Sequence, residues 1–432
     1  MIFPQPLPSR LSHSLLNAEQ CTHCGYCLPH CPTYRYHNDE SESPRGRISI
    51  ILALQSGRIT PEQTVETLSH CLLCRACHTS CPVGVRPGKL IGLARGIAAP
   101  APSPWPMQLL HWITNRPRWT AWIARLIQGY RLSGLQSLVR QYHLLKFIPK
   151  IAYLESLIPE HLPSYSTSAS PPLPAPRQRI ALMSGCIARL LFPHLQPLAQ
   201  ALAEQVGCEV VVLPDFGCCG APFREHGDRA AFVQQAKRTL QAFAAVGPVD
   251  AVLSESAICT VTARSYVRAL EKEPQYAALA KQFSDKVRGL DEFMAEFAET
   301  GPWQQANPGW GKLAFHDHCQ TRHGLGVIAP ARRLLCALSA PWQELPNAGQ
   351  CCGAGGDYML RFPTVSQAIG AEKIAAICHV QPDTVICTNP GCIIQMQAGL
   401  RRAGQTIPVR HLAELLWAAA QQRSLTQEES RK

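Results

Sequence analysis

Twenty cysteines dominate the chemistry open to this sequence of 432 residues, and most of them stand in repeated patterns. The chain starts MIFPQPLPSR, which lacks the apolar core of a signal peptide, so we expect it to stay in the cytoplasm. Disulfides are disfavoured in a reducing compartment, where clustered cysteines more often bind metal or carry out redox chemistry. The cysteines therefore predict metal or redox sites.

Eight cysteines fall in two runs, CTHCGYCLPHCP and CLLCRACHTSCP, and both runs read C-x2-C-x2-C-x3-C-P. In two-cluster ferredoxins the fourth cysteine of such a run ligates the other cluster. Structural zinc prefers two cysteine pairs that lie a dozen or more residues apart, so this spacing favours iron–sulfur clusters over zinc. We therefore predict one [4Fe–4S] cluster on Cys21, Cys24, Cys27 and Cys81, and a second on Cys71, Cys74, Cys77 and Cys31.

Two helix starts lie between these runs. Ser43 and Thr60 each place a hydroxyl before a proline, and Gln63 completes a capping box in the second case. The intervening chain is therefore helical rather than extended. We expect residues 1–100 to form an α-helical ferredoxin-type domain with two [4Fe–4S] clusters.

The other eight patterned cysteines follow a longer repeat. Their spacing, C-x31-CC-G-x38-C, occurs twice, and each member of the second copy lies 133 residues after its counterpart. A register kept over this length predicts two similar domains. The first copy comprises Cys186, Cys218, Cys219 and Cys259, and the second comprises Cys319, Cys351, Cys352 and Cys392.

Short apolar runs lead into these cysteines, and helical stretches such as 228–245 separate them. Strands that alternate with helices indicate α/β domains with a parallel sheet, which we place at 179–300 and 311–421. In such sheets the sites lie at the strand ends, so we expect all eight cysteines at strand ends, where each set can converge. The matching stretches VRGLDEFM and VRHLAELL predict closing helices.

Adjacent cysteines allow several roles. Neighbouring thiolates can bind two irons of one cluster or form a redox thiol, and Gly220 and Gly353 would let the backbone turn around the sulfur ligands. The alternatives are a buried packing pair, or a scaffold that only grips a partner subunit. We treat the eight repeat cysteines as candidate ligands of additional clusters or as redox thiols. We interpret the remaining four, Cys208, Cys336, Cys378 and Cys387, as structural.

Three histidines surround Cys319 in the stretch HDHCQTRH, namely His316, His318 and His323. Imidazoles so placed could tune the thiolates or pass protons. The alternative for each is a structural histidine that only fills its hydrogen bonds.

Residues 101–162 form a Trp-rich connecting segment. In PRWTAWIARLIQ, residues 117–128, apolar side chains recur at helical spacing along one face and arginines lie off that face. A basic amphipathic helix of this kind can lie in a membrane interface, and the alternative is docking on the protein's own core or on a partner subunit. A Pro/Ser-rich linker at 163–178 and a polar tail at 422–432 complete the organisation.

The formal net charge of +11 favours an acidic partner or an anionic membrane surface, with solubility as the plainer explanation. No basic stretch interleaved with aromatics indicates a nucleic-acid module. No run of 18 uncharged apolar residues exists, so we expect no membrane-spanning helix. The chain lacks a GxGxxG fingerprint, and we predict neither a dinucleotide site nor a catalytic residue on it.

The motif order resembles that of the iron–sulfur subunits of bacterial glycolate oxidases, and the two CCG repeats resemble the cysteine-rich domains of heterodisulfide reductases. The motifs that carry the resemblance are CTHCGYCLPHCPTY, SPRGRI, CLLCRACHTSCPVGVR, LAFHDHC, CCGAGG and TNPGCIIQ. The implied fold class is α+β multidomain: an N-terminal α-helical two-[4Fe–4S] ferredoxin domain, followed by two similar α/β CCG domains. One departure concerns Ser256 and Asn389, which stand where heterodisulfide-reductase-type motifs carry a fifth cysteine.

The resemblance implies an electron-transfer subunit of a flavin-dependent 2-hydroxy-acid dehydrogenase, most simply one for glycolate. FAD would reside on a partner subunit, and the electrons would pass to a membrane quinone at the cytoplasmic face of the inner membrane. Alternative readings are the equivalent subunit of a lactate or glycerol-3-phosphate dehydrogenase complex, and a heterodisulfide-reductase-like thiol/disulfide enzyme.

Overall fold

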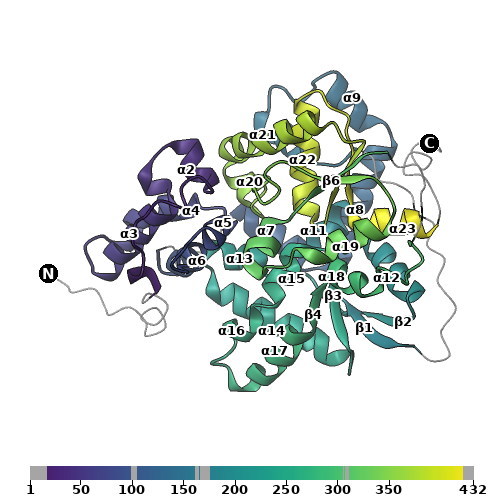
Figure 1. The fold of residues 1–432 in the computed structure, drawn as a ribbon, viewed down its shortest axis with the longest axis horizontal. Coiled ribbons are helices and arrows are strands. Elements are labelled where there is room, and N and C mark those ends of the chain that lie inside the picture. Colours follow the sequence, from purple (N-terminus) through teal and green to yellow (C-terminus); the bar gives the residue numbers. More distant parts are fainter. Residues whose placement is uncertain are drawn as a thin grey trace.

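The computed structural model describes residues 17–98, 105–160, 165, 176–304, 306 and 311–421. Most of the expected linker at 163–178 and all of the polar tail at 422–432 lie outside the described residues. The N-terminal helices lie at one end of the molecule, and the two repeats form the larger body beside them (Figure 1). Among the described residues, no helix has both the length and the apolar character needed to cross a bilayer.

The N-terminal part is helical, as predicted. Ser43 accepts a hydrogen bond from the Gly46 amide, and Thr60 forms a capping box with Gln63, so both predicted helix starts are confirmed. Ile48, shielded from solvent, belongs to the apolar core of this domain. The elements are α2 (Pro32–His37), η1 (Glu40–Glu42), α3 (Pro44–Gln55), α4 (Pro61–Ser69), α5 (Ala76–Thr79) and α6 (Pro87–Ala98).

Four helices connect this domain to the repeats: α7 (Trp105–Thr114), α8 (Pro117–Leu132), α9 (Leu135–Gln141) and α10 (Pro149–Ser156). The predicted amphipathic helix is α8, but its large apolar residues do not face the protein's own core. Its buried residues are Thr120 and Ala124, whereas Trp119 and Trp122 are 47% and 53% exposed. The small side chains allow close approach to the neighbouring helix of the first repeat, so the tryptophans are left outside.

Each repeat contains a four-stranded sheet in which every strand pair is parallel, as the alternating pattern predicted. The first sheet has the order β2-β1-β3-β4 and the second the order β6-β5-β7-β8. The strands are β1 (Gln178–Leu182), β2 (Cys208–Val212), β3 (Ala251–Ser254), β4 (Val287–Gly289), β5 (Leu313–His316), β6 (Trp342–Glu344), β7 (Thr384–Cys387) and β8 (Val409–His411).

The helices of the first repeat are α11 (Cys186–Leu191), α12 (Leu195–Gln205), α13 (Ala221–His226), α14 (Arg229–Ala245), α15 (Ala257–Ala263), α16 (Tyr266–Ala269), α17 (Pro274–Lys286) and α18 (Leu290–Met294), followed by η2 (Ala295–Phe297). Those of the second are η3 (Gln320–Leu325), α19 (Ala329–Ala337), α20 (Tyr358–Arg361), α21 (Pro363–Val380), α22 (Pro390–Arg402) and α23 (Leu412–Ala420).

The predicted closing helices need a correction. VRG and VRH do not start the helices but form the edge strands β4 and β8, which pair with β3 and β7, and only then do α18 and α23 begin. A three-residue strand carries too little periodicity to be distinguished from a helix start by sequence.

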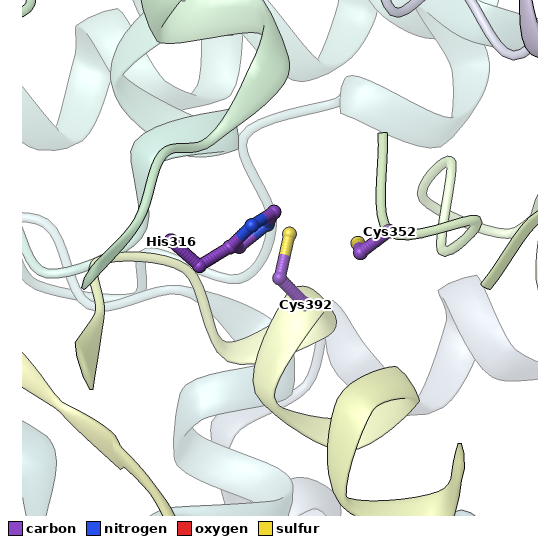
Figure 2. A group of neighbouring side chains, drawn as sticks. All are labelled: His316, Cys352 and Cys392. Carbon is purple, nitrogen blue, oxygen red and sulfur yellow. The ribbon is translucent and has the colours of Figure 1, made fainter. Parts of the chain in front are cut away.

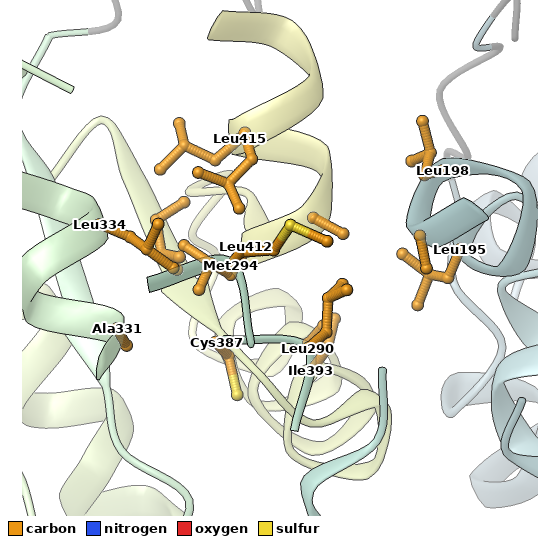
Figure 3. Close-up of a cluster of buried hydrophobic side chains, with 14 of the residues drawn as sticks. Leu195, Leu198, Leu290, Met294, Ala331, Leu334, Cys387, Ile393, Leu412 and Leu415 are labelled. Atoms are coloured by element: carbon orange, nitrogen blue, oxygen red, sulfur yellow. The ribbon is translucent and has the colours of Figure 1, made fainter. Parts of the chain in front are cut away.

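The repeats share one apolar core across their interface (Figure 3). Helix α23 of the second repeat packs against α12 of the first, and α18 of the first packs against α19 of the second. Leu195 and Leu412 are fully or almost fully buried there, as are Leu290 and Leu334. Each closing helix thus covers the other repeat, and this exchange fixes the sheets with respect to one another.

Candidate functional site

The structure sorts the eight N-terminal cysteines into the two predicted sets. Cys21, Cys24, Cys27 and Cys81 line one pocket, and Cys31, Cys71, Cys74 and Cys77 line a second, with Cys77 reaching both. The fourth cysteine of each run thus lines the pocket of the other run: Cys81 lines the first pocket and Cys31 the second. Four thiols around each pocket form a donor set suited to [4Fe–4S] clusters.

Three of these cysteines, Cys31, Cys74 and Cys77, are buried, and four others are half-buried. Burial raises the pKa of Cys27 to about 11 and that of Cys74 and Cys77 well above the usual range. Such thiols stay protonated until a metal displaces their protons, which couples cluster binding to proton release. Burial also raises the pKa of Cys31, and the buried cation of Arg47 opposes that rise.

The two cluster-binding loops have the same unusual backbone. His23 and Leu73, which precede the second cysteine of each run, have φ values of 54° and 52°, and Gly25 and Arg75, which follow it, have values of 87° and 64°. A left-handed conformation costs a non-glycine residue about 1–2 kcal/mol. These loop conformations are therefore unfavourable by themselves and must be held by the surrounding structure. The sequence alone did not reveal this feature.

The paired cysteines of the repeats occupy equivalent turns. Gly220 and Gly353 have φ values of 83° and 87°, and their amides donate to the Sγ atoms of Cys218 and Cys351 at 3.4 Å in both cases. A Cβ on Gly353 would lie 2.3 Å from the backbone oxygen of Ser366. The predicted need for glycine after each pair is therefore confirmed.

The expectation that all eight repeat cysteines sit at strand ends is wrong in detail. Cys186 starts α11, while Cys259 and Cys392 lie inside α15 and α22, several residues after the preceding strands end. The sheets still bring them together, because each helix begins directly above the carboxyl end of its strand. Sequence pattern locates strands but not the length of the turn that follows them.

All eight repeat cysteines line a single cavity of about 130 Å³ between the two repeats. Leu72 of the N-terminal domain reaches it, and so do the polar side chains of Glu225, His318 and Gln320. Gln320 donates to Glu225 at 2.9 Å, which links the two repeats across the cavity. The sequence predicted two separate cysteine sites, whereas the structure makes them two walls of one chamber.

The first repeat has a chain of interacting thiols. Cys186 Sγ lies 3.9 Å from Cys218 Sγ, and this contact lowers the pKa of Cys186. Contacts with Cys218 and Cys259 likewise lower the pKa of Cys219, well below its usual range. A thiolate in such a chain is shared among neighbours, which is the arrangement that metal binding or thiol exchange requires.

The second repeat differs in its surroundings. In this repeat, contact with Cys351 and burial raise the pKa of Cys319 well above the usual range. Cys387, interpreted from sequence as structural, is fully buried and interacts with the Cys392 thiol. His316, at the end of β5, points toward Cys352 and Cys392 (Figure 2). Cys387 could have been noticed earlier, because the repeat register aligns it with Ser254 beside the first set.

The other two histidines take separate places. His318 lines the cavity, and burial, together with nearby Arg75, lowers its pKa to about 4. His323 Nε2 donates to the Gly349 carbonyl at 2.8 Å, and its Nδ1 hydrogen-bonds with Thr79 Oγ1, also at 2.8 Å. His323 therefore joins the N-terminal domain to the second repeat, which is the structural alternative considered above.

The residues that replace the fifth cysteines meet each other. Ser256 Oγ lies 3.4 Å from Asn389 Oδ1, which also accepts from the Ile258 amide at 3.3 Å, and Asn389 Nδ2 donates to Cys392 Sγ at 3.4 Å. These equivalent positions of the two repeats thus contact each other across the interface. Thiolates at both positions would repel across this contact, whereas a hydroxyl and an amide can hydrogen-bond.

The second cluster pocket adjoins the second repeat. Leu72 and Cys74 pack in one buried cluster with Cys351 and Tyr358, and Cys319 packs against it. Cys24, in the first pocket, is exposed. The cysteine sets therefore follow one another from the surface of the N-terminal domain to the chamber between the repeats.

Known families match the same parts of the chain. The 4Fe-4S dicluster domain (Fer4_8) matches residues 17–85, and the cysteine-rich domain (CCG) matches residues 180–264 and 313–397. These matches agree with the predicted order of one ferredoxin-type domain and two CCG domains. They also support iron–sulfur clusters as the cofactor.

Curated relatives cover most of the chain. A probable glycolate oxidase iron-sulfur subunit of Bacillus subtilis (strain 168) is 31% identical over 427 residues, 93% of each chain. The glycolate oxidase iron-sulfur subunit of Escherichia coli (strain K12) is 28% identical over 93% of this chain and 94% of the relative. Lactate utilization protein A of Geobacillus sp. (strain WCH70) is 28% identical over 55% of this chain and 98% of the relative. The chain belongs to the family of glycolate oxidase iron–sulfur subunits.

Proposed function

We propose that this chain is the electron-carrying subunit of a dehydrogenase complex that oxidises glycolate to glyoxylate on an FAD-containing partner subunit. [4Fe–4S] clusters held by the two N-terminal cysteine sets would supply one-electron transfer. Kinship with glycolate oxidase iron–sulfur subunits supports the substrate. The observation that carries the electron-transfer role is the succession of cysteine sets from the exposed Cys24 to the buried Cys74 beside Cys351.

The residues around the two pockets fit different tasks. At the first pocket, Cys24 and the 67% exposed Tyr26 present the site to a partner protein. At the second, Arg47 is buried and donates to Thr33 and to Glu42. These hydrogen bonds hold the guanidinium beside Cys31, out of contact with water. A cation in a dry environment favours the more negative, reduced form of a neighbouring cluster.

The test is whether glycolate reduces this chain only through its partner. We would purify the complex anaerobically, add glycolate, and record electron paramagnetic resonance spectra of rapidly frozen samples. We expect reduced-cluster signals in the complex and none in the isolated chain. Cys24→Ser should remove or alter the signal of the first site, while Cys336→Ser, an exposed cysteine far from both pockets in sequence, should not.

The same experiment decides between substrates. The similarity to lactate utilization protein A supports lactate as the second candidate, so lactate and glycerol-3-phosphate are added in parallel. Reduction by lactate but not by glycolate would overturn the glycolate assignment. Disulfide reduction by the isolated chain would instead favour a thiol/disulfide enzyme acting at the chamber cysteines. If no flavoprotein is recovered with the chain, the proposal fails.

A membrane quinone is the proposed acceptor, and helices α7–α10 are the proposed contact with an anionic bilayer. Most of the large hydrophobic side chains that are exposed in the described residues lie between residues 109 and 154, including Trp122 at 53% and Phe147 at 83%. No Asp or Glu stands between Glu66 and Glu155, and Glu155 in α10 is paired with Arg140, so unpaired arginines and lysines predominate on this surface. Apolar area beside positive charge is what attracts a protein to anionic lipid.

Vesicle sedimentation tests this contact. We expect the full chain to bind phosphatidylglycerol-containing vesicles, and Trp119→Glu with Trp122→Glu to reduce binding at least tenfold. Ile328→Glu, which changes an exposed apolar residue of the second repeat, should leave binding unchanged. If the double variant binds vesicles normally but loses the flavoprotein, the surface is a subunit interface and the membrane proposal is wrong.

A further inference from the structure

Three donor atoms converge in the second repeat: a ring nitrogen of His316 and the Sγ atoms of Cys352 and Cys392. All lie within 4.8 Å of one another, and all three residues are at most 3% exposed. They come from three elements, the end of β5, the turn after β6, and α22, so only the fold brings them together (Figure 2). A tetrahedral Zn²⁺ with bonds of about 2.3 Å to sulfur and 2.0–2.1 Å to nitrogen needs donors about 3.5–3.8 Å apart, close to this spacing.

His316 provides the strongest indication that this group binds an ion. Both of its ring nitrogens are buried and lack a hydrogen-bond partner among the described residues. An imidazole left in this state costs free energy unless something binds it.

The first repeat lacks this arrangement. Its counterpart of His316 is Met183, which is fully buried in the apolar core beside Cys219 and Cys259. Among the described residues, no three donors of the first cysteine set gather within 4.8 Å of one another, and neither do three from either N-terminal set. A [4Fe–4S] cluster is bound by cysteines spread around a cube, so the sets with more widely spaced donor atoms suit clusters. The three closely spaced donor atoms of the second repeat suit a single ion.

One other tight group exists among the described residues, formed by His37, Glu42 and His70. There the Glu42 carboxylate already pairs with the buried guanidinium of Arg47. A divalent cation at that position would face a fixed positive charge. Near the group in the second repeat the cation is Lys373, which donates to the Asn347 carbonyl at 2.9 Å and is not hydrogen-bonded to any of the three donors in the described structure.

We propose that His316, Cys352 and Cys392 bind a single zinc-class ion, with His316 supplying the ligand that the absence of a fifth cysteine at Asn389 leaves open. Cys352 and Cys392 also line the chamber, so the fourth coordination position faces its interior. Binding displaces the two thiol protons and leaves the histidine neutral. Zinc carries no electrons, so the second repeat would not extend the electron path beyond the N-terminal sites.

The experiment is elemental analysis of the full chain, purified anaerobically with its clusters and equilibrated with Zn²⁺. The main variant is His316→Met, because the first repeat shows that this scaffold accepts methionine at the equivalent position. Cys392→Ser is the second variant. Met183→Leu and Cys259→Ser are the matched controls in the first repeat. Circular dichroism verifies that each variant is folded.

We expect about one zinc per chain in the parent protein, and its loss in His316→Met and Cys392→Ser, with iron and sulfide unchanged. Both controls should keep the zinc. Replacement by Co²⁺ should give the absorption bands of tetrahedral thiolate-bound cobalt in the parent and not in His316→Met. Zinc that stays bound without His316, or iron and sulfide that fall together with it, would overturn the proposal. Cluster reduction by glycolate is a separate readout, so failure here leaves the proposed function untouched.

Discussion

The two repeats have the same sheet order but different chemistry. Strand β3 and strand β7 lie at an offset of 133 residues, both sheets have the same order, and both cysteine pairs end in a left-handed glycine. Around the cysteines, however, the first repeat has Met183, Leu240 and Ser254 where the second has His316, Lys373 and Cys387. The scaffold sets where the thiols stand, and a few facing residues decide what they can bind.

The largest effect should come from the shared glycine. Gly353→Ala would place a Cβ 2.3 Å from the Ser366 carbonyl, which belongs to the backbone and cannot move aside, and at a φ of 87°. We expect a loss of about 4 kcal/mol in the free energy of unfolding, because a left-handed alanine and an overpacked contact add together. Anaerobic urea titration followed by circular dichroism measures this loss.

Two further alanine variants separate the causes. Gly220→Ala meets only side chains, those of Phe232 at 3.0 Å and Gln235 at 3.4 Å, and Gly326→Ala meets nothing within 4 Å at a φ of 72°. We expect both to cost about 1–2 kcal/mol, the price of the backbone conformation. Equal losses of stability at Gly353 and Gly220 would mean that the two turns are equally tightly packed. The two repeats would then not differ sterically at this position.

Sequence reasoning recovered the parts of the fold that depend on local pattern. The proline-led helices at Pro44 and Pro61 and the parallel sheets follow from spacing and capping, which are properties of neighbouring residues. It failed for the short edge strands β4 and β8, whose three residues gain their identity only from the strand beside them.

The site was harder to predict than the fold, because its key contacts join distant residues. Ser256 and Asn389 stand 133 positions apart, and nothing local indicates that they touch. The outward face of α8 was equally hidden, since amphipathic periodicity does not say which side of a helix meets the protein. Lys373 could have been found by aligning the repeats, where an amine stands in place of Leu240.

Changing the buried residue at the equivalent positions Leu240 and Lys373 should have the next largest effect. Lys373 is fully buried and its Nζ donates to the Asn347 carbonyl at 2.9 Å, whereas Leu240 is fully buried in the apolar core of the first repeat. Leu240→Lys should therefore cost about 3 kcal/mol, because a buried ammonium without a prepared acceptor is not compensated. Lys373→Met should change stability by less than about 1 kcal/mol, because removing the desolvated charge offsets the lost hydrogen bond.

Urea titration of both variants and of the conservative control Leu240→Met checks the asymmetry. The control should differ from the parent by less than about 1.5 kcal/mol, as for other volume-conserving core changes. If Lys373→Met proves as damaging as Leu240→Lys, the amine is a required structural element of the second repeat, and the two cores differ more deeply than their side chains indicate.

The smallest effect concerns the closing helices, which carry carboxylates with opposite shifts. Burial and the neighbouring charge of Glu292 raise the pKa of Asp291, at the start of α18, to about 6. At Glu414, in α23, burial opposes ionisation, but His194 and Arg410 outweigh it and lower the pKa to about 2. Asp291 therefore stabilises the fold most below its unfolded pKa of about 3.9, and this contribution is lost as the pH rises through about 6. Glu414 contributes stability above its unfolded pKa of about 4.3, which is lost only as the pH falls toward 2.

Of these two carboxylates, only Asp291 should titrate between pH 5 and pH 7.5, whereas the lowered pKa of His318 in the second repeat adds stability as the pH rises toward 6.5. The stability of the parent relative to Asp291→Asn should therefore fall by about 1 kcal/mol across this window, because the histidine contribution is common to both proteins. Glu414→Gln should lower stability by the same amount at every pH in the window and leave the slope intact, because Glu414 does not titrate there. Parallel pH profiles of the parent and Asp291→Asn would show that Asp291 does not titrate in this window and would remove this difference between the two closing helices.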